Sequence, residues 1–274
     1  MKLNAENKNI RIGGTDCDYI CFGTGSDALI MLPGVGDGFK TARGVAIPFA
    51  YMYRSFAEHF KVYVFSRRNN IPEGFTTADM ADDLDDIMQR TGIEPAHVFG
   101  VSQGGMIAQQ LALRHPDRVK SLVLAVTASR PNDLMRESLE SWLEMADRDD
   151  YKGIMLDTAG RSYTGEYLKR GIMINNMLSV VRPRDYTRFR VLCRSCLTHD
   201  VYDELHRINC PVRIIGADQD NVLGPAASVE MKAQIPQSSL YMYEGYSHGV
   251  YEQASGDFNS RVLRYLMWQK IGRD

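Results

Sequence analysis

The sequence predicts an α/β protein with a mainly parallel, doubly wound sheet and a helical cap inserted between two strands. Three observations support this fold. Short apolar runs rich in β-branched residues alternate with helical patterns along most of the 274 residues, which is typical of parallel sheets covered on both faces. The alternation stops between positions 130 and 207, where only helical patterns occur. One apolar run ends at Ser102 among three glycines, and the functional loops of such sheets follow the strand ends.

Six runs are expected to form strands, because they are short, apolar and bounded by turn residues. Amphipathic patterns between them predict helices, one of which is expected to have Thr77 as its N-cap and Gly92 as its C-cap. The expected strands are 28–32, 61–65, 96–100, 121–127, 212–217 and 239–243, and the expected core helices are 47–60, 76–92, 104–115 and 258–270.

The helical stretch between the strands 121–127 and 212–217 is expected to be a cap domain. Four segments in it predict helices: DLMRESLESWLEMA, DYKGIMLDTA, GEYLKRGIMINNML and RDYTRFRVLCRSCL. We therefore expect a first core part at 1–129, the cap at 130–207 and a second core part at 208–274. Because the cap leaves and rejoins the sheet at its functional edge, it is expected to lie over Ser102 and to govern substrate choice.

Composition and charge limit the classes of partner. The chain is 44% hydrophobic and 24% charged, with a formal net charge of −2. It is therefore expected to be a globular protein without a large basic surface for nucleic acid or for an anionic membrane. Its polar first residues lack the apolar core of a secretory signal, so we expect a cytoplasmic protein. The oligomeric state is left open.

The five cysteines are expected to be free thiols, because their number is odd and no secretory signal is recognised. Cys193 and Cys196 have C-x-x-C spacing, with His199 three residues further on. A zinc site would need four ligands, usually from two such pairs, and the second pair is missing. We favour the alternative interpretation, a half-buried face of a helix, and expect neither a metal nor a cofactor.

The residues GVSQGG place Ser102 in a G-x-S-x-G pattern directly after an apolar run. A serine on a tight strand-to-helix turn exposes its hydroxyl as a nucleophile. Gly100, Gly104 and Gly105 are expected to relieve the crowding of this turn and to let the following helix lie close to the strand. We therefore expect Ser102 to be the nucleophile of a catalytic site.

A nucleophilic serine needs a base and a carboxylate that orients the base. Of the six histidines, His248 alone is expected in a loop at the carboxyl end of a strand, within YEGYSHGVYE. Two aspartates follow the strand at 212–217, in GADQDNVLGP. We expect Asp220 to be the acid and Asp218 to brace the loop, with Asp218 as the alternative acid.

Acyl chemistry on such a serine also needs backbone N–H groups that stabilise the oxyanion of the tetrahedral intermediate. One is expected from Gln103, which follows the nucleophile at the positive end of the next helix. The other is expected from the turn after the strand at 28–32, in PGVGDG, with Val35 as the donor.

These features together resemble the α/β-hydrolase superfamily, in its capped, esterase-like branch with a serine nucleophile. The resemblance covers nearly the whole chain and rests on LPGVGDG, GVSQGG, GADQD and GYSHG, with the order Ser102, Asp220, His248. It departs at Pro33-Gly34, where many members have His-Gly. The backbone donor is expected to survive this change, although the turn is expected to have a different shape.

The resemblance implies a serine hydrolase that cleaves a small ester or a related acyl compound through an acyl-enzyme on Ser102. The expected partner is therefore a small acyl molecule, and neither nucleic acid nor a membrane. Alternatives with the same residues are acyl transfer, amide hydrolysis, C–C bond hydrolysis and a ligand receptor with little turnover. Epoxide hydrolases and dehalogenases of this fold have aspartate at the elbow, and Ser102 argues against them.

Overall fold

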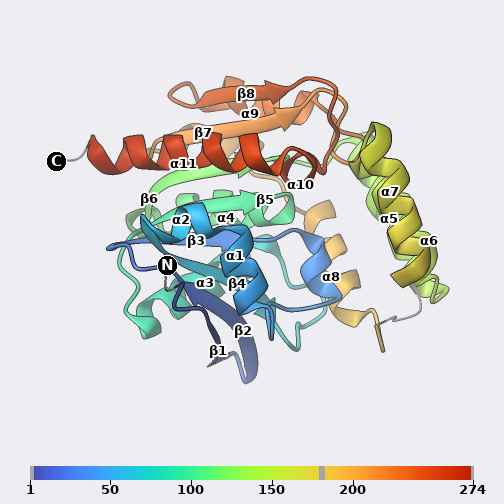
Figure 1. The fold of residues 1–274 in the computed structure, drawn as a ribbon, viewed down its shortest axis with the longest axis horizontal. Coiled ribbons are helices and arrows are strands. Elements are labelled where there is room, and N and C mark those ends of the chain that lie inside the picture. Colours follow the sequence, from blue (N-terminus) through green and yellow to red (C-terminus); the bar gives the residue numbers. More distant parts are fainter. Residues whose placement is uncertain (1–2, 179–182, 273–274) are drawn as a thin grey trace.

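The computed structural model describes the backbone of residues 3–178 and 183–272, and the side chains of residues 3–171 and 183–272. Its centre is an eight-stranded sheet in the order β1-β2-β4-β3-β5-β6-β7-β8 (Figure 1). Strands β3 to β8 are parallel to one another, whereas β1 and β2 form antiparallel pairs at one edge. The strands are β1 Glu6–Ile12, β2 Thr15–Phe22, β3 Asp27–Leu32, β4 Phe60–Arg68, β5 Ala96–Val101, β6 Val119–Ala125, β7 Val212–Ala217 and β8 Ser239–Tyr243.

The expected α/β fold is confirmed, and the six predicted strands are present with shifted ends. The sequence analysis does not predict β1 and β2. Most of β1 is exposed, and Asp16 and Asp18 interrupt the first half of β2, so that only its last residues, 19–22, are apolar. β2 is nevertheless largely buried, because it lies between β1 and β4 and its side chains belong to the apolar cores of both faces.

Helices cover both faces of the sheet, as in a doubly wound fold. Alternate residues of a strand point to opposite faces, so Ile30 belongs to the apolar core of one face and Leu29 to that of the other. The first face carries α3 Thr77–Thr91, α4 Gln103–Arg114 and α9 Ala226–Gln234. The second face carries α1 Ala46–Met52, α2 Arg54–Ala57 and α11 Ser255–Ile271. No helix in the described part of the chain is long and apolar enough to span a membrane.

The predicted helix over 47–60 is wrong in its second half. It breaks at Tyr53 into α1 and α2 and ends at Ala57. Phe60 instead begins β4, where it pairs with Asp27 of β3. The aromatic pattern that suggests one long helix therefore belongs to two short helices and to the start of a strand.

The N-cap of α3 is Thr76 and not Thr77. The Thr76 hydroxyl accepts the backbone N–H of Asp79 at 3.2 Å, while the Asp79 carboxylate accepts the backbone N–H of Thr76 at 2.8 Å. This reciprocal capping box satisfies two N–H groups that have no acceptor within the helix. Gly92 ends the helix with a φ of 66°, as expected.

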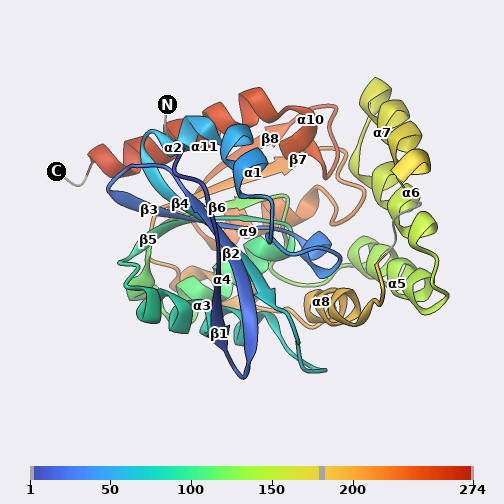
Figure 2. The ribbon, with the colours of Figure 1, turned by 60° about the horizontal axis from the view of Figure 1, so that its bottom comes forward.

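Four helices lie between β6 and β7 in the sequence, and the described residues there form no strand. They occupy the end of the molecule toward which the parallel strands point (Figure 1 and Figure 2). Buried side chains of the first, second and fourth of these helices share an apolar cluster with Met106 of α4 and Leu223 of the loop after β7. The division into domains at residues 130 and 207 remains a prediction. The four helices are α5 Asp133–Asp147, α6 Tyr151–Ser162, α7 Gly165–Leu178 and α8 Thr187–Leu197, and the 3-10 helix η3 Tyr202–Arg207 follows them.

Candidate active site

Ser102 lies on the turn between β5 and α4, in a backbone conformation that side chains rarely adopt. Its φ is 53° and its ψ is −123°, and such residues cost on the order of 1–3 kcal/mol. Its N–H donates to the carbonyl of Ala125 at 3.0 Å. Its carbonyl accepts the N–H of Gly105 at 2.8 Å and the hydroxyl of Thr127 at 2.7 Å. The surrounding structure therefore imposes a strained turn on this serine, and strain of this kind concentrates at sites of chemistry.

Each glycine of this turn lies where a side chain would collide with a fixed neighbour. A Cβ on Gly100 would lie 2.3 Å from the carbonyl oxygen of Gly104, and a Cβ on Gly104 would lie 1.9 Å from that of Leu32. A Cβ on Gly105 would lie 2.6 Å from Thr127 Cβ. The three glycines thus allow α4 to begin directly against β3, β5 and the residues that follow β6.

The loop after β3 also reaches Ser102. A Cβ on Gly34 would lie 3.3 Å from Ser102 Cβ and 3.7 Å from its Oγ. Val35 is the first residue of the 3-10 helix η1 Val35–Gly38, and Gln103 is the first residue of α4. The first N–H groups of a helix have no acceptor within it. The backbone N–H groups of both expected oxyanion donors therefore have no partner within their own helices.

The side chain of Gln103 has a separate role that the sequence analysis does not predict. It is fully buried, and its Nε2 donates to the carbonyl of Leu192 at 2.8 Å and to the hydroxyl of Ser195 at 2.9 Å. Both partners belong to α8. The residue after Ser102 therefore anchors one of the inserted helices to the start of α4.

Asp220 and His248 form a buried pair. Asp220 lies in the loop after β7 and is 4% exposed, while His248 lies between β8 and the short helix α10 Val250–Gln253 and is 7% exposed. Oδ2 of Asp220 is 3.0 Å from Nδ1 of His248. An ionised carboxylate only accepts hydrogen bonds, so in the neutral ring this contact assigns the proton to Nδ1 and leaves Nε2 as an acceptor.

The other carboxylate oxygen of Asp220 is also satisfied. Oδ1 accepts the backbone N–H groups of Val222 and Leu223, both at 2.9 Å. Burial acting alone raises the pKa of Asp220, but the charge and hydrogen bond of His248 and these two N–H donors outweigh it, so the pKa lies below its ordinary value. The carboxylate is therefore held ionised beside the imidazole.

Asp218 occupies a different position in the same loop. It is exposed, and its Oδ1 accepts the N–H of Gly245 at 2.8 Å. The structure thus pairs His248 with Asp220 and uses Asp218 to brace the loop that leads from β8 toward the histidine.

The segment 161–164, which comprises the end of α6 and the turn to α7, is hydrogen-bonded to the loop that carries His248. Three hydrogen bonds make the contact, and each joins a hydroxyl or N–H group of one segment to a backbone carbonyl of the other. The donors and acceptors are Gly249 N–H to Ser162 O at 2.7 Å, Thr164 hydroxyl to Gly245 O at 3.0 Å, and Ser247 hydroxyl to Arg161 O. The segment between α6 and α7 therefore attaches the inserted helices to the histidine loop.

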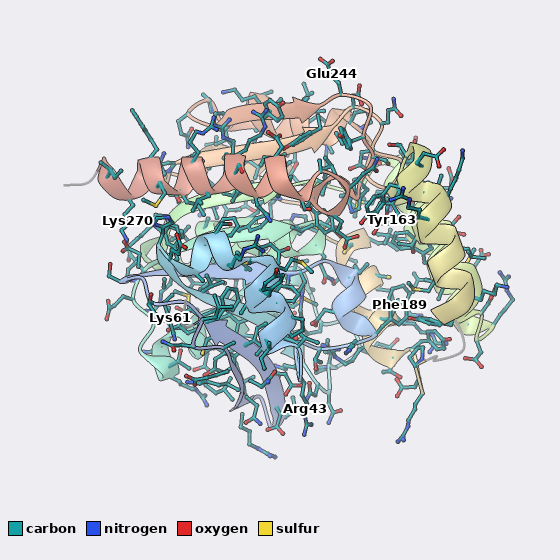
Figure 3. All side chains as sticks on the ribbon, in the orientation of Figure 1. Arg43, Lys61, Tyr163, Phe189, Glu244 and Lys270 are labelled. Atoms are coloured by element: carbon teal, nitrogen blue, oxygen red, sulfur yellow. The ribbon has the colours of Figure 1, made fainter. Side chains whose placement is uncertain are left out.

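Tyr163 in this turn adds a packing contact. A Cβ on Gly249 would lie 2.3 Å from the Tyr163 ring, so the residue after His248 has no space for a side chain. The Tyr163 hydroxyl donates to the carboxylate of Glu252 in α10. Figure 3 shows Tyr163 beside the inserted helices, on the side that faces the rest of the molecule.

Comparison with known proteins decides the family. A family model described as alpha/beta hydrolase fold matches residues 27–255. The chain belongs to the alpha/beta hydrolase fold family. The matched region of this hydrolase-fold chain contains Ser102, Asp220 and His248, as well as all four inserted helices.

Curated and solved hydrolase-fold proteins match most of the chain. A protein named "Putative carbamate hydrolase RutD", from Caulobacter sp. (strain K31), is 26% identical over 220 residues, which cover 76% of this chain and 81% of that protein. The pimeloyl-[acyl-carrier protein] methyl ester esterase of Chromobacterium violaceum is 28% identical over 200 residues, covering 69% and 77% respectively. The structure of the enol-lactonase from Burkholderia xenovorans LB400 has a TM-score of 0.80 at 20% identity and covers 95% of this chain and 100% of that one.

The C-x-x-C pair of this hydrolase-fold chain lies on the buried face of α8. Burial raises the pKa of Cys193 well above its ordinary value and that of Cys196 to about 12. Nδ1 of His199 is 2.9 Å from the hydroxyl of Thr77 in α3. Among the described residues, no three His, Cys, Asp or Glu side chains are grouped so as to hold a metal ion. The helix-face interpretation of Cys193 and Cys196 is confirmed.

His199 is expected to make the fold sensitive to acid. Burial lowers its pKa to about 3, whereas a histidine in the unfolded chain titrates near ~6.5. As pH falls, His199 is therefore protonated first in the unfolded chain. This favours unfolding, so the free energy of unfolding begins to decrease below pH ~6.5 and continues to decrease toward pH 3. We expect His199→Asn, which has no titrating group, to lose less of its Tm than the wild type between pH 7.5 and pH 5.

The measurement is thermal unfolding followed by circular dichroism at several pH values. The matched control is His206→Asn, because His206 is exposed and should leave the wild-type pH dependence unchanged. Parallel Tm-against-pH curves for the wild type and His199→Asn would contradict the prediction, whatever the absolute stability of the variant.

Proposed function

We propose that the protein is a serine hydrolase that cleaves a small ester or a related acyl compound. The observation that carries this is the strained turn of Ser102 on the sheet edge that also carries the buried Asp220–His248 pair. These residues follow β5, β7 and β8, whose carboxyl ends lie at one edge of the parallel sheet. Membership of the alpha/beta hydrolase fold family supports the same chemistry.

In the proposed mechanism, Ser102 Oγ attacks the acyl carbon while Nε2 of His248 takes the hydroxyl proton. The tetrahedral intermediate then expels the alcohol or amine, which receives this proton from His248. Water attacks the acyl-enzyme in the same way and releases the acid, and the Ser102 hydroxyl is restored. Asp220 keeps the ring oriented and stabilises its cationic form throughout, and stays ionised.

Val35 and Gln103 are proposed as the oxyanion donors through their backbone N–H groups. Each begins a helix beside Ser102, and the positive end of α4 adds to the donor strength of Gln103. Donors fixed before the reaction stabilise the negative oxygen without reorganisation, and losing one costs roughly 10²–10³ in kcat in comparable sites.

The substrate class is proposed from the shared chemistry of the relatives. Their names refer to a carbamate, a methyl ester and an enol-lactone. In all three compounds a carbonyl carbon bears a heteroatom leaving group, which is the bond that an activated serine cleaves. We propose that the substrate of this protein has such a bond in a small molecule.

We also propose that residues 130–207 form a cap that shapes the acyl pocket. Leu139 and Trp142 of α5 and Phe189 of α8 belong to the apolar cluster that also includes Met106 and against which Val35 packs. Met106 lies in the first turns of α4, directly after Ser102, and Val35 follows Gly34 in the loop after β3 that reaches the serine. Because one methylene of pocket contact changes discrimination by only about 1–3 kcal/mol, a cap of this kind would grade acyl groups by size more than exclude them.

Turnover on a panel of acyl compounds tests the proposed function. We expect the purified protein to hydrolyse 4-nitrophenyl acetate, butyrate or octanoate, with kcat on the order of 1–10³ s⁻¹ for the preferred chain length. An N-aryl carbamate, a lactone and an anilide in the same panel distinguish the bond types. Added methanol distinguishes transfer from hydrolysis, because a transferase would convert the acyl group to its methyl ester.

A ligand receptor with this fold would give a different pattern. It would be labelled once by a fluorophosphonate, which bonds to an activated serine, but would release no more than one equivalent of 4-nitrophenol. Absence of both labelling and turnover would contradict the proposed nucleophile.

A further inference from the structure

Asp37, Arg67 and Arg188 form a buried ionic cluster next to the loop after β3, and we refer to it as the Asp37 cluster. Asp37 lies in η1, Arg67 in β4 and Arg188 in α8. Their side chains are 2%, 4% and 15% exposed respectively. Charged side chains are almost never this deeply buried unless they are paired. Here two guanidinium groups share a single carboxylate.

Hydrogen bonds join the three elements of the Asp37 cluster. Oδ2 of Asp37 accepts Nη2 of Arg188 at 2.7 Å and the backbone N–H of Arg67 at 3.0 Å. Arg188 also donates to the backbone carbonyls of Asp37, Arg67 and Arg68. Nη2 of Arg67 donates to the carbonyl of Pro33. Arg188 of the inserted helices thus connects β4 to η1, the helix that begins at Val35, and Arg67 connects β4 to Pro33 just before it.

The positive charge of the Asp37 cluster exceeds its negative charge. Nη1 of Arg67 is 4.0 Å from Oδ2 of Asp37, and its Nε and Nη1 have no hydrogen-bond partner among the described residues. Burial lowers the pKa of Arg67, but arginine remains protonated in proteins. Burying a cation without a full set of partners is unfavourable for folding, so this arrangement is not explained by stability alone.

We propose that Arg67 is a positioning residue for the oxyanion loop, residues 33–38, and that Asp37 and Arg188 hold Arg67 in place. Its hydrogen bond to Pro33 fixes the peptide plane that leads into Gly34, and a Cβ on Gly34 would lie 3.3 Å from Ser102 Cβ. The excess positive charge behind this loop also favours the negative oxygen of the tetrahedral intermediate, because charges interact strongly in a region that excludes water. The inference rests on the proposed function and assigns α8 a part in the chemistry.

The test compares Arg67→Met with Arg67→Lys in the full-length protein. We expect Arg67→Met to lower kcat for the preferred 4-nitrophenyl ester by about 10- to 100-fold and to change KM less than threefold, because the loop acts on the transition state. An alkyl trifluoromethyl ketone, which adds to the serine and forms a stable oxyanion, should lose affinity by the same factor as kcat/KM. Arg67→Lys keeps the charge and should recover part of the loss.

Arg68→Met is the matched control. Arg68 is the next residue and has an ion pair of its own with Asp83, a residue of α3, so the same substitution there should leave kcat and ketone affinity near those of the wild type. Arg188→Met leaves Arg67 in place but removes the second cation beside Asp37, together with the hydrogen bonds of Arg188 to the backbone of η1 and β4. It should lower kcat about 3- to 10-fold, again with little change in KM. If Arg67→Met does not fold, Arg188→Met serves as the test variant.

Wild-type kcat and ketone affinity in folded Arg188→Met or Arg67→Met would overturn the inference, as would an equal loss in Arg68→Met. A loss confined to KM would also overturn it, because it would indicate a substrate contact and no effect on the oxyanion. A wild-type protein that is neither labelled by a fluorophosphonate nor active on the panel would contradict the proposed function itself, which is a distinguishable result.

Discussion

Replacing Ser102 with alanine is expected to lower kcat for ester hydrolysis by about 10⁴- to 10⁶-fold while the fold persists. The substitution removes only the proposed nucleophilic oxygen. The turn itself is held by the backbone of residue 102, through Ala125, Gly105 and the Thr127 hydroxyl, and alanine retains these contacts. The measurement is release of 4-nitrophenol, together with labelling by a fluorophosphonate, which should disappear in the variant.

Ser260→Ala provides the matched control for this substitution. Ser260 is an exposed serine of α11 whose hydroxyl donates to the carbonyl of Gly256, within its own helix. It should keep wild-type turnover and labelling. Turnover by Ser102→Ala within about tenfold of the wild type would refute the mechanism proposed here, provided that its circular dichroism spectrum matches that of the wild type.

Asp220→Asn is expected to lower kcat by about 10⁴-fold, which corresponds to about 5.5 kcal/mol of transition-state stabilisation. In the wild-type protein, Oδ2 of Asp220 accepts a hydrogen bond from Nδ1 of His248 and so keeps the proton on Nδ1. An asparagine amide turned to donate toward Nδ1 would favour the opposite tautomer, and Nε2 would then carry a proton and could no longer act as the base. KM should change little, because Asp220 is not proposed to touch the substrate.

Asp218→Asn is the matched control for Asp220→Asn. It has the same change of charge two residues away, in the same loop, and the amide oxygen of asparagine can still accept the N–H of Gly245. We expect a loss in kcat of less than tenfold. The opposite ranking of the two variants would transfer the role of acid to Asp218 and leave the rest of the mechanism in place.

Much of the fold is predictable because strands of a parallel sheet are buried on both faces. The run 28–32 is apolar throughout, and 212–217 is interrupted only by Arg213, so both are recognised without knowing what covers them. β1 and β2 are not recognised because neither has the continuous apolar pattern of a strand that is buried on both faces. β1 lies at the edge of the sheet and is mostly exposed. β2 has aspartates in its first half and becomes buried through its place between β1 and β4 and through the apolar cores that cover both of its faces.

The candidate site divides in the same way. The turn of Ser102 is a local feature, because the glycines that make it possible lie within three positions of the serine. His248 is predictable from its place in a loop after the last strand. Asp218 and Asp220 have the same chemistry and lie in the same loop, so residue type gives only a preference between them. The contact of Asp220 with the His248 ring is what separates them.

The sequence by itself determined the alternation of strands and helices, the strained turn and the set of residues available for the chemistry, because each depends on burial patterns or on neighbours within a few positions. Only the tertiary structure decided which distant side chains meet. Arg188 reaches Asp37 across 151 positions, Gln103 reaches α8 across 89, and Ser247 reaches Arg161 across 86. Hydrogen bonds act over about 3 Å and depend on direction, so such contacts leave no periodicity or spacing in the chain and exist only once the helices and loops have packed.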